Sequence, residues 1–295
     1  MKNAPLARRI FAFLIDYILL GIFGMILGAF FFDFFYKLDF YGVFLGLAVY
    51  VLYFGVLNSR AGKGQTPGKK MLKIKTVDAG GNFLSPEKSF LRALVLYLPI
   101  TILSLNAPVT SSLFLTISIV YALAISFCVA TAYLLLFNKP SRQGAHDLIA
   151  KSFVVRAAET PVSGFNRKTS ASVIFAACAA VLILFTAVMS YNSFIGGLLK
   201  SAKTVYDKYG LNVQQITIGY RKNLNTGKTS SNASIVIRKY LNDDEALAKD
   251  IAQTLYDINP NVRRTDFITV IFIKNYNIGI ATAQTKFIYN YPVAK

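Results

Sequence analysis

Residues 10–32 read IFAFLIDYILLGIFGMILGAFFF and contain one charged side chain, Asp16. A run of this length is long enough to cross a bilayer as a single helix. Asp16 is seven residues into the run, so at about 1.5 Å of rise per residue it lies about 10 Å below the surface where the helix enters. Carboxylates at such depth face a cavity, the protein interior or a cationic partner. Two interpretations stay open. Asp16 is structural, either protonated or paired with Arg9, or it handles an ion or a proton.

The composition indicates a membrane protein with basic loops. The 295 residues are 54% hydrophobic and 16% charged, and 32 basic against 14 acidic side chains give a net charge of +18. In a soluble protein this excess would suggest nucleic acid. Here the basic residues lie in loops between apolar runs, where they meet the anionic cytoplasmic surface of a membrane. We therefore expect a lipid bilayer with anionic head groups as partner, and no nucleic acid.

The apolar runs predict five crossings. The uncharged runs, Asp16 excepted, are residues 10–32, 40–57, 93–137 and 169–199. The third far exceeds the roughly 20 residues that one crossing needs, and residues 105–108 predict a turn between two helices. A helical hairpin there keeps the basic loops 58–92 and 138–168 on one side, as the positive-inside tendency requires. The N-terminus is then cytoplasmic and the C-terminal region extracytoplasmic.

The predicted fold class is an α-helical integral membrane domain of about five transmembrane helices plus a small C-terminal α+β two-layer domain. Residues 1–160 form the membrane domain with four of the helices, 161–199 a linker and the fifth helix, and 200–295 the extracytoplasmic domain. In that domain the order helix, strand, strand, helix, strand, strand predicts antiparallel pairing. Asn242 and Glu245 form a capping-box pattern for its second helix. The basic charge of this domain is either a solvated surface, which is the default, or the contact for an extracytoplasmic partner such as an anionic membrane surface, peptidoglycan or an acidic protein.

Small residues recur on two of the predicted helices. Gly21, Gly24 and Gly28 fall on one side of the first, and Gly42 and Gly46 are four residues apart on the second. Such spacing is typical of helices whose backbones approach closely within a membrane. We therefore predict that the first and second helices pack tightly around Asp16.

Three stretches occur in order with membrane segments between them. They are residues 6–16 (LARRIFAFLID), 64–78 (GQTPGKKMLKIKTVD) and 142–150 (RQGAHDLIA). Together they resemble the RDD family of bacterial membrane proteins, over roughly residues 5–156. The resemblance implies that Arg9, with Arg8 as the neighbouring candidate, Asp16 and Asp147 are the arginine and the two aspartates for which the family is named. It also implies a multi-pass protein of the bacterial cytoplasmic (inner) membrane. Some members are implicated in cation/proton antiport.

A charge cluster is expected at the inner membrane boundary. The strand-like stretches 72–78 and 151–156 lie on the same side and should pair, because either alone would be unstable. Pairing would bring the 146–147 dipeptide toward the foot of the first helix. The expected members of the cluster are Arg9, Asp16, Arg142, His146 and Asp147. It either handles an ion or a proton, or joins the helices through ion pairs. We favour a hydrogen-bonded tautomer for His146 over a proton shuttle.

The loop at residues 62–70 superficially resembles a phosphate-binding loop. Lys63 stands where that motif requires Gly, and Lys70 where it requires Ser or Thr. We predict instead a tight turn centred on Pro67 and Gly68, with Lys63, Lys69 and Lys70 contacting lipid phosphates.

No enzymatic chemistry is expected. The chain has one histidine and two cysteines, Cys128 and Cys178, both in apolar segments, and no serine or cysteine in a recognisable nucleophile setting. We therefore predict no catalytic residue, no cofactor and no metal site.

Two functions are compatible with the sequence. The first is transport of a small cation or proton through Asp16, with Asp147 as a second carboxylate; five helices would then call for a homo-oligomer to enclose a path. The second is a non-transporting anchor or sensor whose membrane domain displays the extracytoplasmic domain to a partner. The family resemblance ranks transport slightly ahead.

Overall fold

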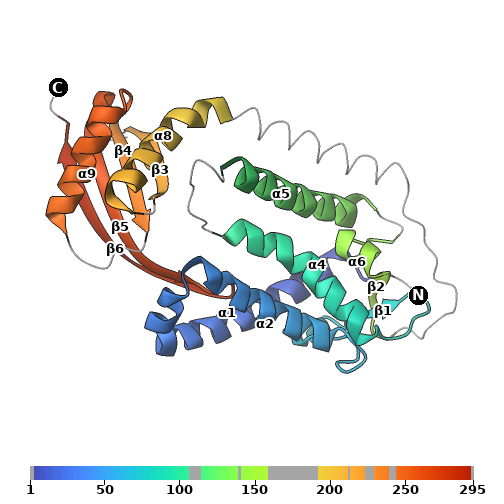
Figure 1. The fold of residues 1–295 in the computed structure, drawn as a ribbon. Helices are drawn as coiled ribbons and strands as arrows, with labels where there is room; N and C mark the ends of the chain where they lie inside the picture. The colour runs from blue at the N-terminus through green and yellow to red at the C-terminus, as the bar shows by residue number, and fades with distance from the viewer. Residues whose placement is uncertain are drawn as a thin grey trace.

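The computed structural model describes residues 3–105, 114–138, 141–158, 192–211, 213–222, 229–238 and 244–293. Long helices form the N-terminal half of this part of the chain. A four-stranded sheet with helices α8 and α9 forms the C-terminal part (Figure 1).

The long helices follow the apolar runs. They are α1 (Leu6–Lys37), α2 (Gly42–Leu57), α4 (Pro86–Ser104) and α5 (Phe114–Phe137), with a short 3-10 helix, η1 (Asp39–Tyr41), before α2. Within the described residues, Leu6–Lys37, Asp39–Leu57 and Ile119–Phe137 are long and apolar enough to cross a membrane.

The count of five crossings stays a prediction. The 93–137 run does contain two helices, α4 and α5, which pack on each other. The turn expected between them falls at residues 105–108, and only Leu105 is within the described residues. Helix α4 has Glu87, Lys88 and Arg92 in its first two turns and Pro99 in its interior. The fifth predicted crossing lies outside the described residues, except from Asn192 onward, where α8 begins.

Short elements gather at the N-terminal end of α1. They are α3 (Pro67–Met71), β1 (Ile74–Asp78), α6 (Ala145–Ile149) and β2 (Ser152–Arg156). Strands β1 and β2 pair antiparallel, which confirms the predicted pairing. The loop expected as a tight turn is instead the start of α3. Thr66 is the N-cap, its hydroxyl accepting the Lys69 N–H, and Pro67 takes the first helical position, which suits its missing N–H.

The C-terminal domain is a two-layer α+β fold with a mixed sheet. Its elements are α8 (Asn192–Tyr209), β3 (Val213–Lys222), β4 (Thr229–Arg238), α9 (Glu245–Ile258), the 3-10 helix η2 (Val262–Arg264), β5 (Phe267–Asn277) and β6 (Thr282–Pro292). The strand order is β3-β4-β5-β6. The expectation of antiparallel pairing holds for β3–β4 and β5–β6 and is wrong for β4–β5, which are parallel. The reason is that α9 crosses over between these two strands and returns the chain to the same end of the sheet.

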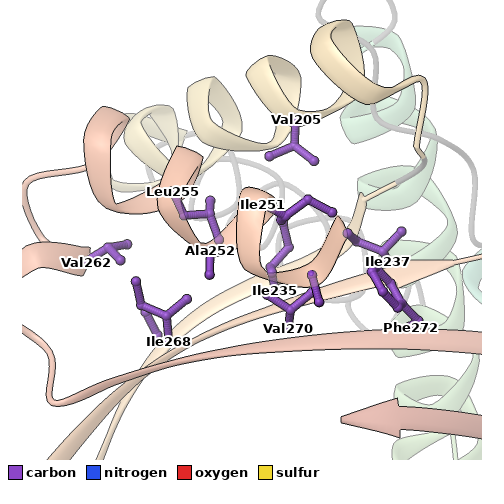
Figure 2. Close-up of a cluster of buried hydrophobic side chains, with 12 residues drawn as sticks. Val205, Ile235, Ile237, Ile251, Ala252, Leu255, Val262, Ile268, Val270 and Phe272 are labelled. Atoms are coloured by element: carbon purple, nitrogen blue, oxygen red, sulfur yellow. The ribbon is translucent and has the colours of Figure 1, made fainter. Parts of the chain in front are cut away.

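Helices α8 and α9 cover one face of this sheet. Ala248, Ile251, Ala252 and Leu255 form an apolar stripe on α9 at helical spacing, and all four are buried. They pack with Val205 of α8 and with inward-facing residues of β4 and β5, as Figure 2 shows. The residue that caps α9 is Asp244, whose carboxylate accepts the Leu247 N–H. The predicted capping residue, Asn242, lies outside the described residues.

The β5–β6 hairpin extends beyond the sheet and reaches the membrane helices (Figure 1). Its tip, residues 276–281, contributes Tyr276, Ile278 and Ile280 to an apolar cluster. The cluster's members from α1, α2 and α4 are Leu20, Phe35, Tyr50, Phe54, Ala93 and Tyr97. The two halves of the chain therefore share one core.

Four glycines make room for this hairpin tip. A Cβ on Gly24 would lie 2.9 Å from the Ala281 Cβ, and a Cβ on Gly46 would lie 2.6 Å from the Gly279 Cα. Gly28 and Gly42 meet Tyr276 and Asn277 in the same way. The prediction that these glycines serve contact between the first two helices is therefore wrong: they allow a β-hairpin to approach both helices.

Several polar groups of the tip are hydrogen-bonded within the protein. The Ile278 N–H donates to the Ala281 carbonyl at 3.0 Å, and the Gly279 N–H donates to the Asn277 side chain at 2.9 Å. The Asn277 amide donates to the Ser104 carbonyl of α4 at 3.2 Å. Non-helical backbone is tolerated at membrane depth only when it is buried in protein in this way.

The glycine contacts can be tested with a cross-linking reporter. The Lys274 Nζ on β5 lies 3.1 Å from an Asp33 carboxylate oxygen on α1, so cysteines at these two positions, in a chain whose two native cysteines are replaced by serine, should be joined by a bifunctional maleimide that spans the length of the two native side chains. Gly46→Ala should lower the cross-linking yield severalfold, because its methyl group would meet hairpin backbone. Gly21→Ala is the matched control, since a Cβ there meets nothing within 4 Å. Equal yields in the two variants would contradict the assignment.

Candidate functional site: a buried charge centre at the end of α1

Asp16 is held by neutral hydrogen-bond donors. Its side chain is buried on α1, at 1% exposure. One carboxylate oxygen accepts from the Tyr53 hydroxyl of α2 and from the Gly68 N–H of α3, both at 2.9 Å. The other accepts from the Thr66 hydroxyl at 2.5 Å. None of the ion pairs among the described residues includes Asp16. Three neutral donors therefore take the place of the predicted pairing with Arg9.

The residue types of the Thr-Pro-Gly-Lys loop follow from this contact. Thr66 serves as the N-cap of α3 and also as a donor to Asp16. Gly68 must lack a side chain, because a Cβ would meet the Ala12 carbonyl and would lie 3.1 Å from the Asp16 carboxyl carbon. The first turn of α3 thus lies directly against α1, and the free N–H of a helix start is satisfied by the carboxylate.

Lys69 points into the protein. Its ammonium donates to the Asn58 side chain and, at 2.6 Å, to the Thr76 hydroxyl of β1. Burial, and then repulsion from Arg92, lowers the pKa of Lys69 well below its usual value. Lys63 and Lys70 are both exposed. The lipid contact of the three lysines stays a prediction, and within the trio only Lys69 has its charged group turned inward.

Asp147 is the centre of a network of cations. One oxygen accepts from Arg92 Nε of α4 and from the Ser152 hydroxyl of β2, both at 2.8 Å. The other lies 3.5 Å from His146 Nε2 and 4.0 Å from Arg9 Nη1. Burial alone would raise the pKa of Asp147, but attraction from Arg92, and also from Arg9 together with the hydrogen bond from Ser152, holds it well below its usual value. The carboxylate is therefore ionised and paired.

Arg9 connects α1 to the two short strands. Its guanidinium donates to the Arg142 carbonyl and, at 3.0 Å, to the Val154 carbonyl of β2. Arg142 thus contributes its backbone to the centre. Its backbone is in the left-handed region, with φ at 50°, which places the carbonyl within reach of Arg9.

His146 is buried and neutral. Burial lowers the pKa of His146 to about 4, against the opposing attraction of Asp147. Its Nε2 faces Asp147, and its Nδ1 is buried with no hydrogen-bond partner. The tautomer interpretation is compatible with this arrangement, and the role of His146 stays a prediction.

The predicted cluster is two neighbouring centres. Arg9, His146 and Asp147 come together around α6 and β2, with Arg142 contributing its backbone, whereas Asp16 bonds to α2 and α3. Sequence reasoning missed Arg92 and Tyr53. Arg92 is the last charged residue before the uncharged run 93–137, and that position was the available signal for a cation at the membrane boundary. Nothing comparable marks Tyr53 among the many aromatic residues of the chain.

A cavity of about 270 Å³ touches both centres. Its lining also includes apolar residues of α1, α4, α5 and β1. The polar residues that line it are Arg9, Asp16, Lys69, Arg92, Tyr97, His146 and Asp147. Among the described residues, no group of three His, Cys, Asp or Glu side chains is arranged to hold a metal ion.

Apolar helices joined by a buried charge centre define an integral membrane domain, here continuous with a β-hairpin from a second domain. A family model described as RDD family matches residues 3–151, just over half of the chain, and the chain belongs to that family. The match includes Arg9, Asp16 and Asp147, and residues 200–295 lie outside it. No curated protein and no solved structure matches the chain.

Removing the charge of Asp147 should strongly destabilise the membrane domain. Asp147→Asn leaves Arg92 and Arg9 buried without their counter-charge, and breaking a buried pair in this way costs about 3–5 kcal/mol of unfolding free energy. Titration with a denaturing detergent would measure the loss. Asp33→Asn is the control, because it removes an ion pair in which the Asp33 side chain is 81% exposed, and it should cause a much smaller loss. Similar losses in the two variants would rule out a structural role for the pair.

Proposed function

We propose that this protein is a membrane anchor that holds its C-terminal α+β domain at the extracytoplasmic face of the bacterial cytoplasmic membrane. The observation that carries the proposal is the insertion of the hairpin tip among α1, α2 and α4. A domain on a free linker would need no such contact. With the hairpin tip packed in the core of the membrane domain, the rest of the sheet is held at a fixed position relative to the helices.

The state of the two carboxylates supports the same function. Each oxygen of Asp16 already accepts at least one hydrogen bond, and Asp147 is paired with Arg92. A transported cation would have to displace these donors, each with a hydrogen-bonding cost. As structural groups, the carboxylates join α1 to α3 and α4 to the β1–β2 pair.

The arrangement along α1 supports the proposed topology. Asp16 and the short elements contact the N-terminal half of α1, while the hairpin tip contacts Gly24 and Gly28 in its C-terminal half. At about 1.5 Å of rise per residue, Gly24 and Gly28 lie about 12–18 Å along α1 from Asp16, so the two contacts are at different depths. The proposal therefore assigns the basic loops to the cytoplasm and the sheet to the other side. A partner for residues 200–295 and a homo-oligomer remain part of the proposal.

Topology is tested by fusing compartment-specific reporters to Lys295. Alkaline phosphatase, active only outside the cytoplasm, should be active in this fusion, and a cytoplasm-dependent fluorescent protein should stay dark. The same reporters placed after Gly80, in a loop assigned to the cytoplasm, should give the opposite result. Fluorescence from the C-terminal fusion would contradict the proposal.

Transport of a small cation or proton is the second candidate. The observation that favours it is that one cavity touches both Asp16 and Asp147, because a path for protons or cations would have to pass both groups. This candidate differs from the anchor in requiring the two carboxylates to change partners during function.

An exchange assay separates the two candidates. Sealed vesicles containing the wild-type protein should show no pH change on addition of Na⁺ or K⁺ beyond that of empty vesicles, with an established antiporter as positive control. Asp16→Asn should reduce the amount of folded protein, because an amide cannot accept all three hydrogen bonds. Wild-type exchange that disappears per folded molecule in Asp16→Asn, and persists in Asp33→Asn, would establish transport instead.

A further inference from the structure

The cavity beside Asp16 and Asp147 combines charge with an apolar wall. Three basic side chains, from Arg9, Lys69 and Arg92, line it together with the two carboxylates. The apolar part comes from three helices, with Ile10 and Phe13 on α1, Leu96 on α4 and Leu135 on α5. A wholly polar solute would leave this apolar wall uncovered, and a wholly apolar one would leave the charged groups unsolvated.

Two hydrogen-bond donors on side chains that line the cavity have no partner. The carboxylates already accept hydrogen bonds from Tyr53, Thr66, Gly68, Arg92 and Ser152. Arg9 Nε and the Tyr97 hydroxyl, by contrast, are buried and have no partner. Buried polar groups are rarely left without partners. An oxygen-rich anion that accepts from Arg9 and Tyr97 would satisfy both, whereas a cation has no lone pair with which to accept from them.

Two residues that line the cavity also belong to the exposed apolar surface of α1. Ile10 and Phe13 line it and are also 49% and 38% exposed, within a helix apolar enough to cross a membrane. A volume of about 270 Å³ lies just below the roughly 300–1,000 Å³ of pockets that enclose whole drug-sized ligands. It suits a head group and a few methylenes, with the remaining chain lying against α1 in the bilayer.

We propose that this cavity binds an anionic amphiphile that enters sideways from the membrane. Its phosphate or carboxylate accepts hydrogen bonds from Arg9 and Tyr97, and its first methylenes pack against Ile10, Phe13 and Leu135. The site differs from the surface contact predicted for Lys63 and Lys70, because the head group is enclosed by protein. It is also independent of whether the protein is an anchor or a transporter.

Competition for a fluorescent fatty acid tests the ligand class. The full chain, purified in a neutral detergent, is titrated with cis-parinaric acid, and four competitors are added separately. Oleate or dioleoyl phosphatidate should displace the probe at least about tenfold better than oleyl alcohol, which has the tail without the charge. Inorganic phosphate, which has the charge without the tail, should not displace it. Whichever anionic amphiphile competes better identifies a carboxylate or a phosphate head. Equal competition by oleyl alcohol would overturn the proposal, as would displacement by inorganic phosphate.

Two variants locate the site. Leu135→Trp fills the apolar wall and should weaken binding by roughly tenfold. Leu136→Trp is the matched control on the adjacent, exposed residue, which does not line the cavity, and it should bind as the wild type does. Tyr97→Phe keeps the ring and removes only the unpartnered hydroxyl, so the melting temperature should hold while affinity falls roughly tenfold, as expected for a hydrogen bond to a charged group. Wild-type affinity in both Leu135→Trp and Tyr97→Phe would place any binding elsewhere and overturn the proposal.

Discussion

A carboxylate cannot be left alone in a low-dielectric interior, and the arrangement of the membrane domain follows from satisfying two of them. Asp16 is satisfied by a hydroxyl from α2 and by a hydroxyl and an N–H from the start of α3. These contacts fix the Thr-Pro-Gly-Lys loop against α1. The chain continues from α3 into β1, which pairs with β2. Strand β2 in turn donates the Ser152 hydroxyl to Asp147 and accepts from Arg9 at the Val154 carbonyl. The two carboxylates are thus linked through one continuous set of short elements.

In the C-terminal half of α1, the structure depends instead on the close approach of the hairpin tip to the helix backbone. Gly24 and Gly28 lack the side chains that would hold the hairpin tip away, and Gly46 does the same from α2. Several polar groups of the tip are hydrogen-bonded within the hairpin or to α4, as non-helical backbone among apolar helices requires. Van der Waals contact through glycine and hydrogen bonding within the hairpin together allow a strand pair where helices usually pack only on helices.

The sequence predicted elements better than partners. The long apolar runs predicted the positions of α1, α2 and α5. The turn residues at 105–108 predicted that the run 93–137 contains two helices, and the alternation of apolar and polar residues predicted β1 and β2. The partners of Asp16 were missed because a buried carboxylate can be stabilised either by a cation or by neutral hydrogen-bond donors. The apolar sequence around Asp16 would be the same in both cases. The glycine spacing indicated that another backbone approaches α1 closely. It did not indicate that this backbone is a hairpin about 250 residues later in the chain. The parallel β4–β5 pair was missed because the strand pattern is similar for either direction, and only the path of α9 decides it.

Tyr97 and Phe54 join the two halves of the domain. Both line the cavity, and both belong to the apolar cluster that receives the hairpin tip. The Tyr97 ring is stacked on Tyr50 at 4.4 Å and on Phe54 at 5.0 Å between ring centroids, so it forms a rigid wall with the cavity on one side and the cluster on the other. Close-packed interiors transmit changes in volume to their neighbours. The shape of the cavity and the position of the hairpin tip therefore depend on the same aromatic stack. A substitution that alters this stack will change both, whereas removal of the Tyr97 hydroxyl alone leaves the packing intact and affects only the polar side.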